Sequence, residues 1–191
     1  MKTIISLMPE INDFIGGRGT LEIGYPWLTH GSIMALERLL ELNKDFVILE
    51  CGSGGSTIFF AKRCKSVLSL ETNPVWAKKV KDKLEQEKIE NVNLIILKGN
   101  QEVLDFLSNQ PDGFFDLVLV DSDPTSTSRL DLSNAVVSKV KLKGWMLVDN
   151  WDAWGKDFDY SNPRWEIYTF DSFPTDFFAG KGTRLLKKVG Q

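Results

Sequence analysis

Five short apolar runs recur along the chain, and each is followed by polar residues and then by a segment of helical spacing. The runs cover residues 47–49, 67–70, 94–97, 117–120 and 145–148. Because they are almost continuously apolar, they are typical of strands buried on both faces of a parallel sheet. The segments between them repeat apolar residues every three or four positions, as amphipathic helices do. The pattern predicts five rounds of strand and helix.

The two ends of the chain depart from this pattern. Residues 1–28 are glycine-rich near residues 16–19 and show no clear period, so we expect an irregular lead-in before a single domain over residues 29–191. Residues 165–170 and 183–189 read as two more strands joined by a loop with proline and glycine. The prediction is an α/β fold: a doubly wound, mostly parallel, seven-stranded sheet that ends in an antiparallel strand pair.

Composition narrows the possible partners. The 191 residues carry a net charge of -3, and no dense stripe of Lys or Arg appears. We therefore expect neither nucleic acid nor a membrane surface as partner. Cys51 and Cys64 have no metal or redox spacing, which favours a reducing, cytoplasmic location. With His30 as the single histidine, a His-based triad or zinc cluster is not expected.

A glycine-rich turn follows the first apolar run, at Gly52, Gly54 and Gly55. Glycines at the end of a parallel strand permit a tight turn and let a ligand approach the backbone. The free N–H groups of the following helix favour an anionic group. The turn therefore predicts a site for a nucleotide-like or carboxylate-bearing ligand, and the alternative is a strand–helix turn that binds nothing. The dinucleotide fingerprint would place a third glycine where Thr57 stands.

Polar residues also close the other strands. Since the carboxyl ends of parallel strands meet at one edge of a sheet, where ligands bind in such folds, we expect these residues to gather there. They are Glu50, Gly52, Glu71, Asn100, Asp121, Asp149 and Asn150.

The segment 50–56, Glu-Cys-Gly-Ser-Gly-Gly-Ser, resembles motif I of the class I S-adenosylmethionine (SAM) methyltransferases, E/D-x-G-x-G-x-[GST]. The resemblance covers about residues 29–189 and implies a Rossmann-like fold with SAM as cofactor. It implies that Glu71, about 20 residues after the turn, binds the ribose hydroxyls, the alternative being a solvated carboxylate before a helix. Asn100 and Gln101 stand where the family contacts adenine, although Asp is more usual at the first position. The implied cofactor-binding set is Glu50, Gly52, Ser53, Gly54, Ser56, Glu71, Asn100, Gln101 and Asp121.

A closer likeness is to small-molecule O-methyltransferases of the catechol and caffeoyl-CoA type. Those enzymes hold a divalent cation at positions matched here by Asp121, Asp149 and Asn150, and hard oxygen ligands suit Mg²⁺. The chain departs from them at Pro124, where they carry a lysine base. A "GSGGST" branch of the class I enzymes, in which no metal is implied, is the other reading. In that case Asp149 and Asn150 line the pocket or cap the next segment.

Together these features predict a SAM-dependent methyltransferase acting on a small-molecule acceptor, at a hydroxyl oxygen. Asp121 and Asp149 are the candidate catalytic residues, as base or orienter of the acceptor. A non-catalytic SAM- or nucleotide-binding module is one alternative. An NAD-dependent oxidoreductase is another, disfavoured by Thr57 and by the lack of a Tyr-x-x-x-Lys sequence. The aromatic residues Trp151, Trp154 and Tyr160 either form a lid over the acceptor or cover the sheet edge.

Overall fold

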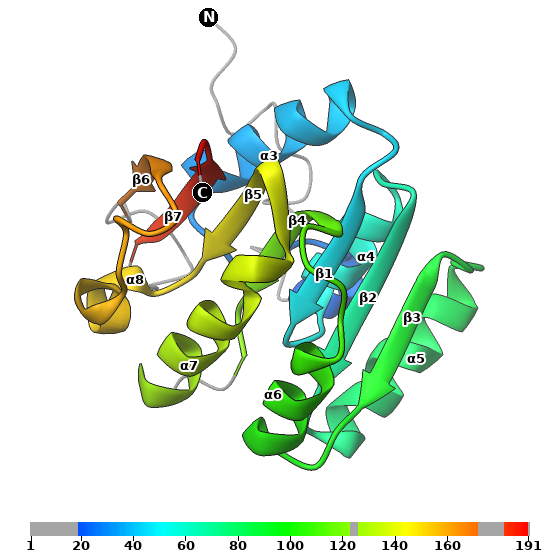
Figure 1. Ribbon diagram of the computed structural model, residues 1–191. Coiled ribbons are helices and arrows are strands. Elements are labelled where there is room, and N and C mark those ends of the chain that lie inside the picture. Colours follow the sequence, from blue (N-terminus) through cyan, green and yellow to red (C-terminus); the bar gives the residue numbers. More distant parts are fainter. Residues whose placement is uncertain (1–18, 123–125, 172–181, 191) are drawn as a thin grey trace, which may run out of the picture.

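A computed structural model describes residues 19–122, 126–171 and 182–190. In these residues seven strands form one sheet in the order β3-β2-β1-β4-β5-β7-β6 (Figure 1). The first five are parallel neighbours, as the continuous apolar runs predict. The strands are β1 (Val47–Cys51), β2 (Ser66–Glu71), β3 (Val92–Ile96), β4 (Phe115–Val120), β5 (Val140–Val148), β6 (Trp165–Phe170) and β7 (Thr183–Lys188).

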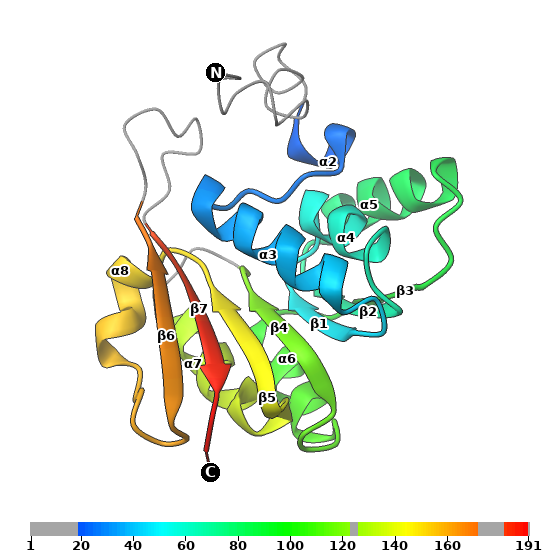
Figure 2. The same ribbon diagram turned by 90° about the horizontal axis from the view of Figure 1, so that it is seen from above.

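Helices lie on both faces of the sheet, which makes the fold doubly wound. Helices α3, α4 and α5 cover one face, and α6 and α7 cover the other (Figure 2). In the described part of the chain, no helix is both long and apolar enough to cross a membrane. The helices are α2 (Thr20–Ile23), α3 (His30–Leu42), α4 (Gly55–Ala61), α5 (Pro74–Gln86), α6 (Asn100–Ser108), α7 (Ser126–Val136) and α8 (Trp151–Trp154).

The two faces of the sheet have separate cores, because successive strand residues point to opposite sides. On one side Leu49 and Val118 pack with apolar residues of α6 and α7. On the other, Ile48 and Leu117 pack with apolar residues of α3 and α4. Because the sheet is buried on both faces, the register of each strand in it is fixed. The register in turn fixes where the polar residues at the end of each strand lie.

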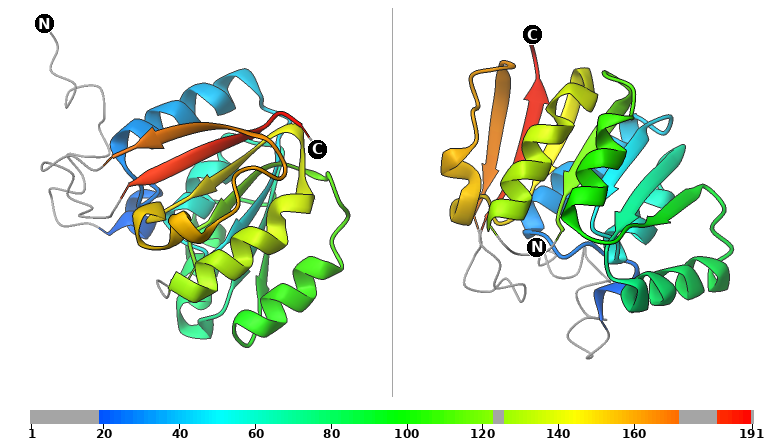
Figure 3. Two further views of the ribbon diagram at one scale, coloured as in Figure 1. Left: turned by 60° about the vertical axis from the view of Figure 1, so that its left-hand side comes forward. Right: turned by 60° about the horizontal axis from the view of Figure 1, so that its bottom comes forward.

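The C-terminal strand pair is antiparallel, as predicted. Strand β7 runs antiparallel to both β5 and β6, and it lies between them (Figure 3). The last strand of the sequence is therefore inserted beside β5, and β6 forms the edge. This order brings Thr183, the first residue of β7, to the carboxyl end of β5.

Part of the segment expected to be irregular is folded. The short helix α2 lies within it, and Tyr25 and Leu28 are each only 2% exposed, in the same core as Phe59 and Phe60. The segment also contacts the glycine turn, since a Cβ at Gly55 would lie 2.1 Å from the carbonyl oxygen of Tyr25. Residues before 19 lie outside the described part.

Candidate functional site

A cavity of about 220 Å³ opens at the carboxyl ends of β1, β2 and β4, beside α6 and α7. This is the edge at which the sequence places its polar residues, and where parallel sheets bind ligands. Its lining residues are Cys51, Gly52, Ser53, Leu70, Glu71, Thr72, Gly99, Asn100, Val103, Asp121, Ser122, Ser128 and Leu132.

Gly52 is required by the close approach of two strand ends. Its φ is 98°, a conformation that favours glycine, and its N–H donates to the carbonyl of Leu70 at 2.8 Å. A Cβ at this position would lie 2.2 Å from the carbonyl oxygen of Asp121. The glycine thus lets the turn after β1 lie directly against the end of β4, which closes that wall of the cavity.

Glu50 lies beneath the glycine turn and does not line the cavity. Its carboxylate is fully buried and accepts hydrogen bonds from the hydroxyls of Ser56, Thr57 (2.6 Å) and Ser69 (2.8 Å). Burial raises the pKa of Glu50 to about 7, although the three hydroxyls oppose the rise. Thr57 also accepts from the N–H of Gly54 at 2.9 Å. Glu50 and Ser56 therefore hold the start of α4 in place, and Gly54 likewise lies outside the lining.

Glu71 lines the cavity and binds the turn from the opposite side. Its Oε2 accepts from the N–H of Ser53 at 3.0 Å and from the Ser53 hydroxyl at 2.7 Å. Its Oε1 accepts from the N–H groups of Thr72 and Asn73, each at 2.8 Å. Asn73 in turn caps α5, as predicted, by accepting from Val75 and Trp76. These contacts fix the Glu71 carboxylate at the end of β2.

The side chains of Asn100 and Gln101 have different surroundings although the residues are neighbours in sequence. Asn100 lines the cavity, and its Oδ1 accepts a hydrogen bond from Ser128 at 3.1 Å. Gln101 is exposed and donates to Asp105, one helical turn further along α6, at 2.9 Å. The structure therefore brings only Asn100 into the site.

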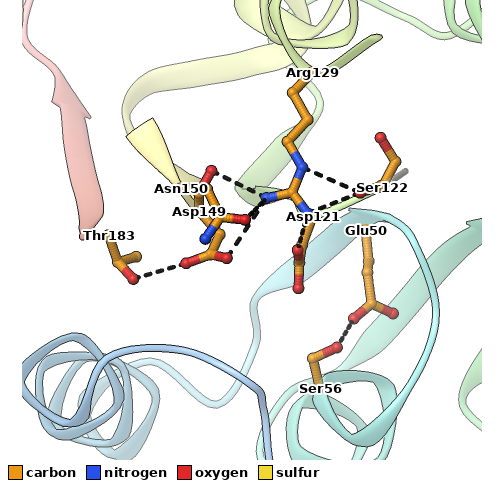
Figure 4. A network of polar contacts seen from close by, with 8 residues as sticks. All are labelled: Glu50, Ser56, Asp121, Ser122, Arg129, Asp149, Asn150 and Thr183. Carbon is orange, nitrogen blue, oxygen red and sulfur yellow. Dashed lines mark hydrogen bonds and ion pairs between the residues drawn. The ribbon is translucent and has the colours of Figure 1, made fainter. Parts of the chain in front are cut away.

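A buried arginine joins the polar ends of β4 and β5. The guanidinium of Arg129, on α7, lies between Asp121, Ser122, Asp149 and Asn150 (Figure 4). Its Nη2 is 2.8 Å from Oδ1 of Asp121, and its Nη1 is 2.9 Å from Oδ1 of Asn150 and 3.5 Å from Oδ2 of Asp149. Side chains from the ends of β4 and β5, which are far apart in sequence, thus share one cation.

The electrostatics of this cluster combine opposing effects. Burial raises the pKa of the Asp121 carboxyl, and nearby Asp149 raises it further, while Arg129 opposes both. Burial also raises the pKa of Asp149, against the effects of Arg129 and of a hydrogen bond from Thr183 at 3.0 Å. Asp121 lines the cavity, whereas Asp149 lies behind it.

The predicted metal ligands, Asp121, Asp149 and Asn150, do come together, but around a guanidinium. A divalent cation needs several oxygen atoms directed at one point, and these are directed at Arg129. Among the described residues, no group of three or more His, Cys, Asp or Glu is placed to hold a metal ion. The arrangement does not fit a bound Mg²⁺.

Sequence reasoning missed Arg129, although a signal was present. The predicted inward residues Leu132 and Val136 follow it by three and seven positions, which places Arg129 on the same helix face. It is 5% exposed, and Ser128 beside it lines the cavity.

Trp151 and Tyr160, two of the aromatic residues after β5, pack against β7 and do not line the cavity. The Arg184 guanidinium is 3.5 Å from the centroid of the Trp151 ring and 5.0 Å from that of Tyr160. Both aromatic residues also pack on the core of α6 and α7. The side chain of Trp154 lies outside the described residues, and so do Asp123 and Pro124, which follow Ser122 in the sequence.

Comparisons with known proteins identify the family of the chain. The family model described as a methyltransferase domain matches residues 49–151, which include the glycine turn, Glu71 and the Arg129 cluster. No curated protein matches the sequence. The chain belongs to this methyltransferase family. It is a SAM-dependent methyltransferase with a Rossmann-like fold.

Solved structures share the fold at low sequence identity. A Klebsiella pneumoniae protein assigned as an O-methyltransferase aligns with a TM-score of 0.68 and 18% identity, over 95% of this chain and 90% of its own. The O-methyltransferase TomG from Streptomyces achromogenes, in complex with SAM, aligns with a TM-score of 0.65 and 17% identity. The alignment covers 82% of this chain and 78% of TomG. An rRNA methylase from Streptococcus thermophilus aligns with a TM-score of 0.63 and 14% identity, over 83% of this chain and 96% of the methylase. At such identities the likeness shows the fold and leaves the acceptor open.

Proposed function

We propose that the single domain transfers the methyl group of SAM to a hydroxyl oxygen of a small molecule. The observation that carries the proposal is the placement of two carboxylates, Glu71 and Asp121, in the wall of one cavity beside the glycine turn. One acid suits a ribose diol, and the other suits the hydroxyl that is methylated.

In this proposal SAM occupies the cavity. The main-chain N–H groups of Ser53, Thr72 and Asn73 hold the Glu71 carboxylate in place. It accepts from the ribose hydroxyls when the Ser53 hydroxyl rotates to another partner and frees an acceptor site. Gly52 and Ser53 present main chain to the methionine part of SAM, and Asn100 meets the adenine edge. Glu50, Gly54 and Ser56 contribute through the shape of the turn. Gln101 has no contact with the ligand.

Asp121 is the proposed base for the acceptor. Methyl transfer forms an O–CH₃ bond as the S–CH₃ bond of the sulfonium breaks, with the acceptor oxygen about 3 Å from the methyl carbon. The hydroxyl proton passes to the Asp121 carboxylate, so no lysine is needed where the related enzymes place one. Asp149 lies behind the wall and holds the cluster together, so its proposed role is indirect.

A small-molecule acceptor is supported by the charge balance. With a net charge of -3 and no basic stripe, the chain lacks the electrostatic attraction on which RNA binding depends. The O-methyltransferase neighbours point the same way, and the rRNA methylase makes RNA the competitor to test.

The test is a turnover assay that follows release of S-adenosylhomocysteine. The acceptors are simple phenols, hydroxy acids, aliphatic alcohols, small amines and total RNA. We expect turnover with a hydroxyl compound, loss of turnover in Asp121→Asn, and unchanged SAM binding in that variant. Turnover on RNA or amines alone would contradict the proposal. SAM binding with turnover on no class would instead indicate the non-catalytic module.

A further inference from the structure

Arg129 has no hydrogen-bond donor to spare. A guanidinium carries five N–H groups. The Nε–H donates to the carbonyl of Ser122 at 3.1 Å, and Nη2 donates to the same carbonyl and to Asp121, both at 2.8 Å. Nη1 donates to Asn150 at 2.9 Å and to the carbonyl of Asp149 at 3.1 Å. All five donors therefore have protein partners, and the guanidinium is not directed at a ligand.

The charges of the cluster also favour Arg129 as its cation over a divalent metal ion. Two carboxylates and one guanidinium leave a single negative charge when the acids are ionised, beside the position proposed for a sulfonium cation. A divalent ion would make the cluster net positive next to that cation. It would also draw Asp121 and Asp149 away from Arg129, and a buried charge left without its partner is strongly destabilising.

We propose that Arg129 takes the place of a divalent metal ion in this site, so that methyl transfer needs no metal and the acceptor needs only one hydroxyl group. The part that concerns the acceptor rests on the proposed function. The part that concerns the cation rests only on the contacts of Arg129.

The acceptor class follows from which members of the cluster reach the cavity. Asp121 and Ser122 line it, whereas Arg129, Asp149 and Asn150 lie behind. A metal ion would hold a vicinal diol through two oxygen atoms, but here one carboxylate is available to one hydroxyl. The acceptor hydroxyl donates to Asp121, the proton moves to that carboxylate, and the methyl group moves from sulfur to oxygen. Arg129 is a positioning residue, because it acts through Asp121.

The first experiment needs no acceptor. Wild-type protein treated with EDTA is titrated with Mn²⁺, and binding is followed by electron paramagnetic resonance, with Asp149→Asn as the matched variant. We expect no Mn²⁺ binding that depends on Asp149. One saturable equivalent that binds to the wild type and is lost in Asp149→Asn would overturn the proposal.

The second experiment tests the charge of Arg129 directly. In Arg129→Ala, guanidinium at millimolar concentration can occupy the vacated space, and urea is a neutral molecule of nearly the same shape. We expect guanidinium, and not urea, to raise the midpoint of thermal unfolding by a few degrees. Equal effects of the two molecules would overturn the proposal. If Arg129→Ala does not fold, Arg129→Lys and Arg129→Met replace it, and the proposal requires the lysine variant to be the more stable.

The third readout uses an acceptor found by the turnover panel. EDTA should leave wild-type turnover unchanged, and single-hydroxyl compounds should match or exceed their catechol counterparts. In Arg129→Lys, kcat should fall about tenfold or more while the Kd for SAM stays the same. Turnover confined to catechols and restored by Mg²⁺ after EDTA would overturn the metal-free reading and leave the methyltransferase function standing.

Discussion

The carboxylate of Glu71 accepts two hydrogen bonds from Ser53, one from its main-chain N–H at 3.0 Å and one from its hydroxyl at 2.7 Å. The residues are 18 positions apart in sequence and come from the ends of adjacent strands. The contact holds the glycine turn against β2, so Glu71 supports the wall of the cavity and also faces into it.

Replacing Glu71 should therefore weaken SAM binding. A hydrogen bond to a charged group contributes about 1.5–3 kcal/mol. Glu71→Ala should thus raise the Kd for SAM by at least about tenfold, since 1.4 kcal/mol is one decade. Isothermal titration calorimetry measures the Kd for SAM of each variant. Ser53→Ala is the control, because it removes one donor to Glu71 and keeps the carboxylate. If Ser53→Ala weakens binding as much as Glu71→Ala, the carboxylate acts through the turn and not on the ligand.

Asn100 and Gln101 offer a matched pair of variants. Asn100→Ala removes a side chain from the cavity wall and should weaken SAM binding by a few-fold, because one neutral hydrogen bond contributes about 1 kcal/mol. Gln101→Ala should leave the Kd unchanged, since that side chain is exposed and paired with Asp105. A loss of affinity in Gln101→Ala alone would show that the end of α6 changes conformation when the ligand binds.

Gly55 has no room for a side chain. Its Cβ would lie 2.1 Å from the carbonyl of Tyr25 and 2.5 Å from that of Thr20, and neither main-chain atom can move alone. Gly55→Ala should lower the free energy of unfolding by about 1–3 kcal/mol, although alanine favours helices. Gly54→Ala is the control, since its nearest neighbour would be 3.9 Å away on Trp76. Thermal unfolding compares the two, and equal melting points would show that residues 20–25 do not pack on α4 in solution.

The buried Glu50 predicts a stability that depends on pH. Its pKa rises from 4.5 in the unfolded chain to about 7 in the fold, so the folded state binds the proton more tightly. The free energy of unfolding should then fall as pH rises from about 4.5 to about 7, by about 3 kcal/mol from this group, and level off above.

Chemical denaturation of the wild type and Glu50→Gln across that pH range isolates the effect. Asp121 and Asp149 titrate in both proteins, so the difference between the two curves belongs to Glu50 and to its repulsion of Asp121, which is a minor cause of the raised pKa of Asp121. The wild type should lose stability relative to Glu50→Gln as pH rises. Parallel curves would mean that the hydroxyls of Ser56, Thr57 and Ser69 offset the cost of burial.

Much of the fold could be predicted because its signals are local. Continuous apolar runs identify parallel strands, since both faces of such strands are covered. Asn73 followed by Pro74 predicts the start of α5. The Asn73 side chain accepts hydrogen bonds from free N–H groups of the first turn, and proline suits the first helical position because its φ is already helical. The first part of β5 was missed because Lys141 and Lys143 interrupt its apolar run. The helix α2 was missed because four residues are too few to show a period.

The candidate site was predicted less fully, because side-chain direction depends on the tertiary structure. The topology of a parallel sheet predicts that the polar residues at the strand ends lie along one edge. The topology does not predict whether each of these side chains faces the ligand or the core. Glu50 turns beneath α4, where three hydroxyls bind it, while Glu71 faces the cavity from the neighbouring strand.

The sequence by itself determined the class of fold, the glycine turn and the acids that close the strands, because periodicity and turn chemistry act over a few neighbouring residues. Only the tertiary structure decided what those acids bind. Arg129 contacts Asp149 and Asn150, 20 and 21 positions away, and β7 brings Thr183 to Asp149 across 34 positions. Such contacts depend on the packing of α7 and on the order of strands, and no local pattern encodes either. For this reason the three residues that match the metal ligands of the resembled O-methyltransferases surround an arginine.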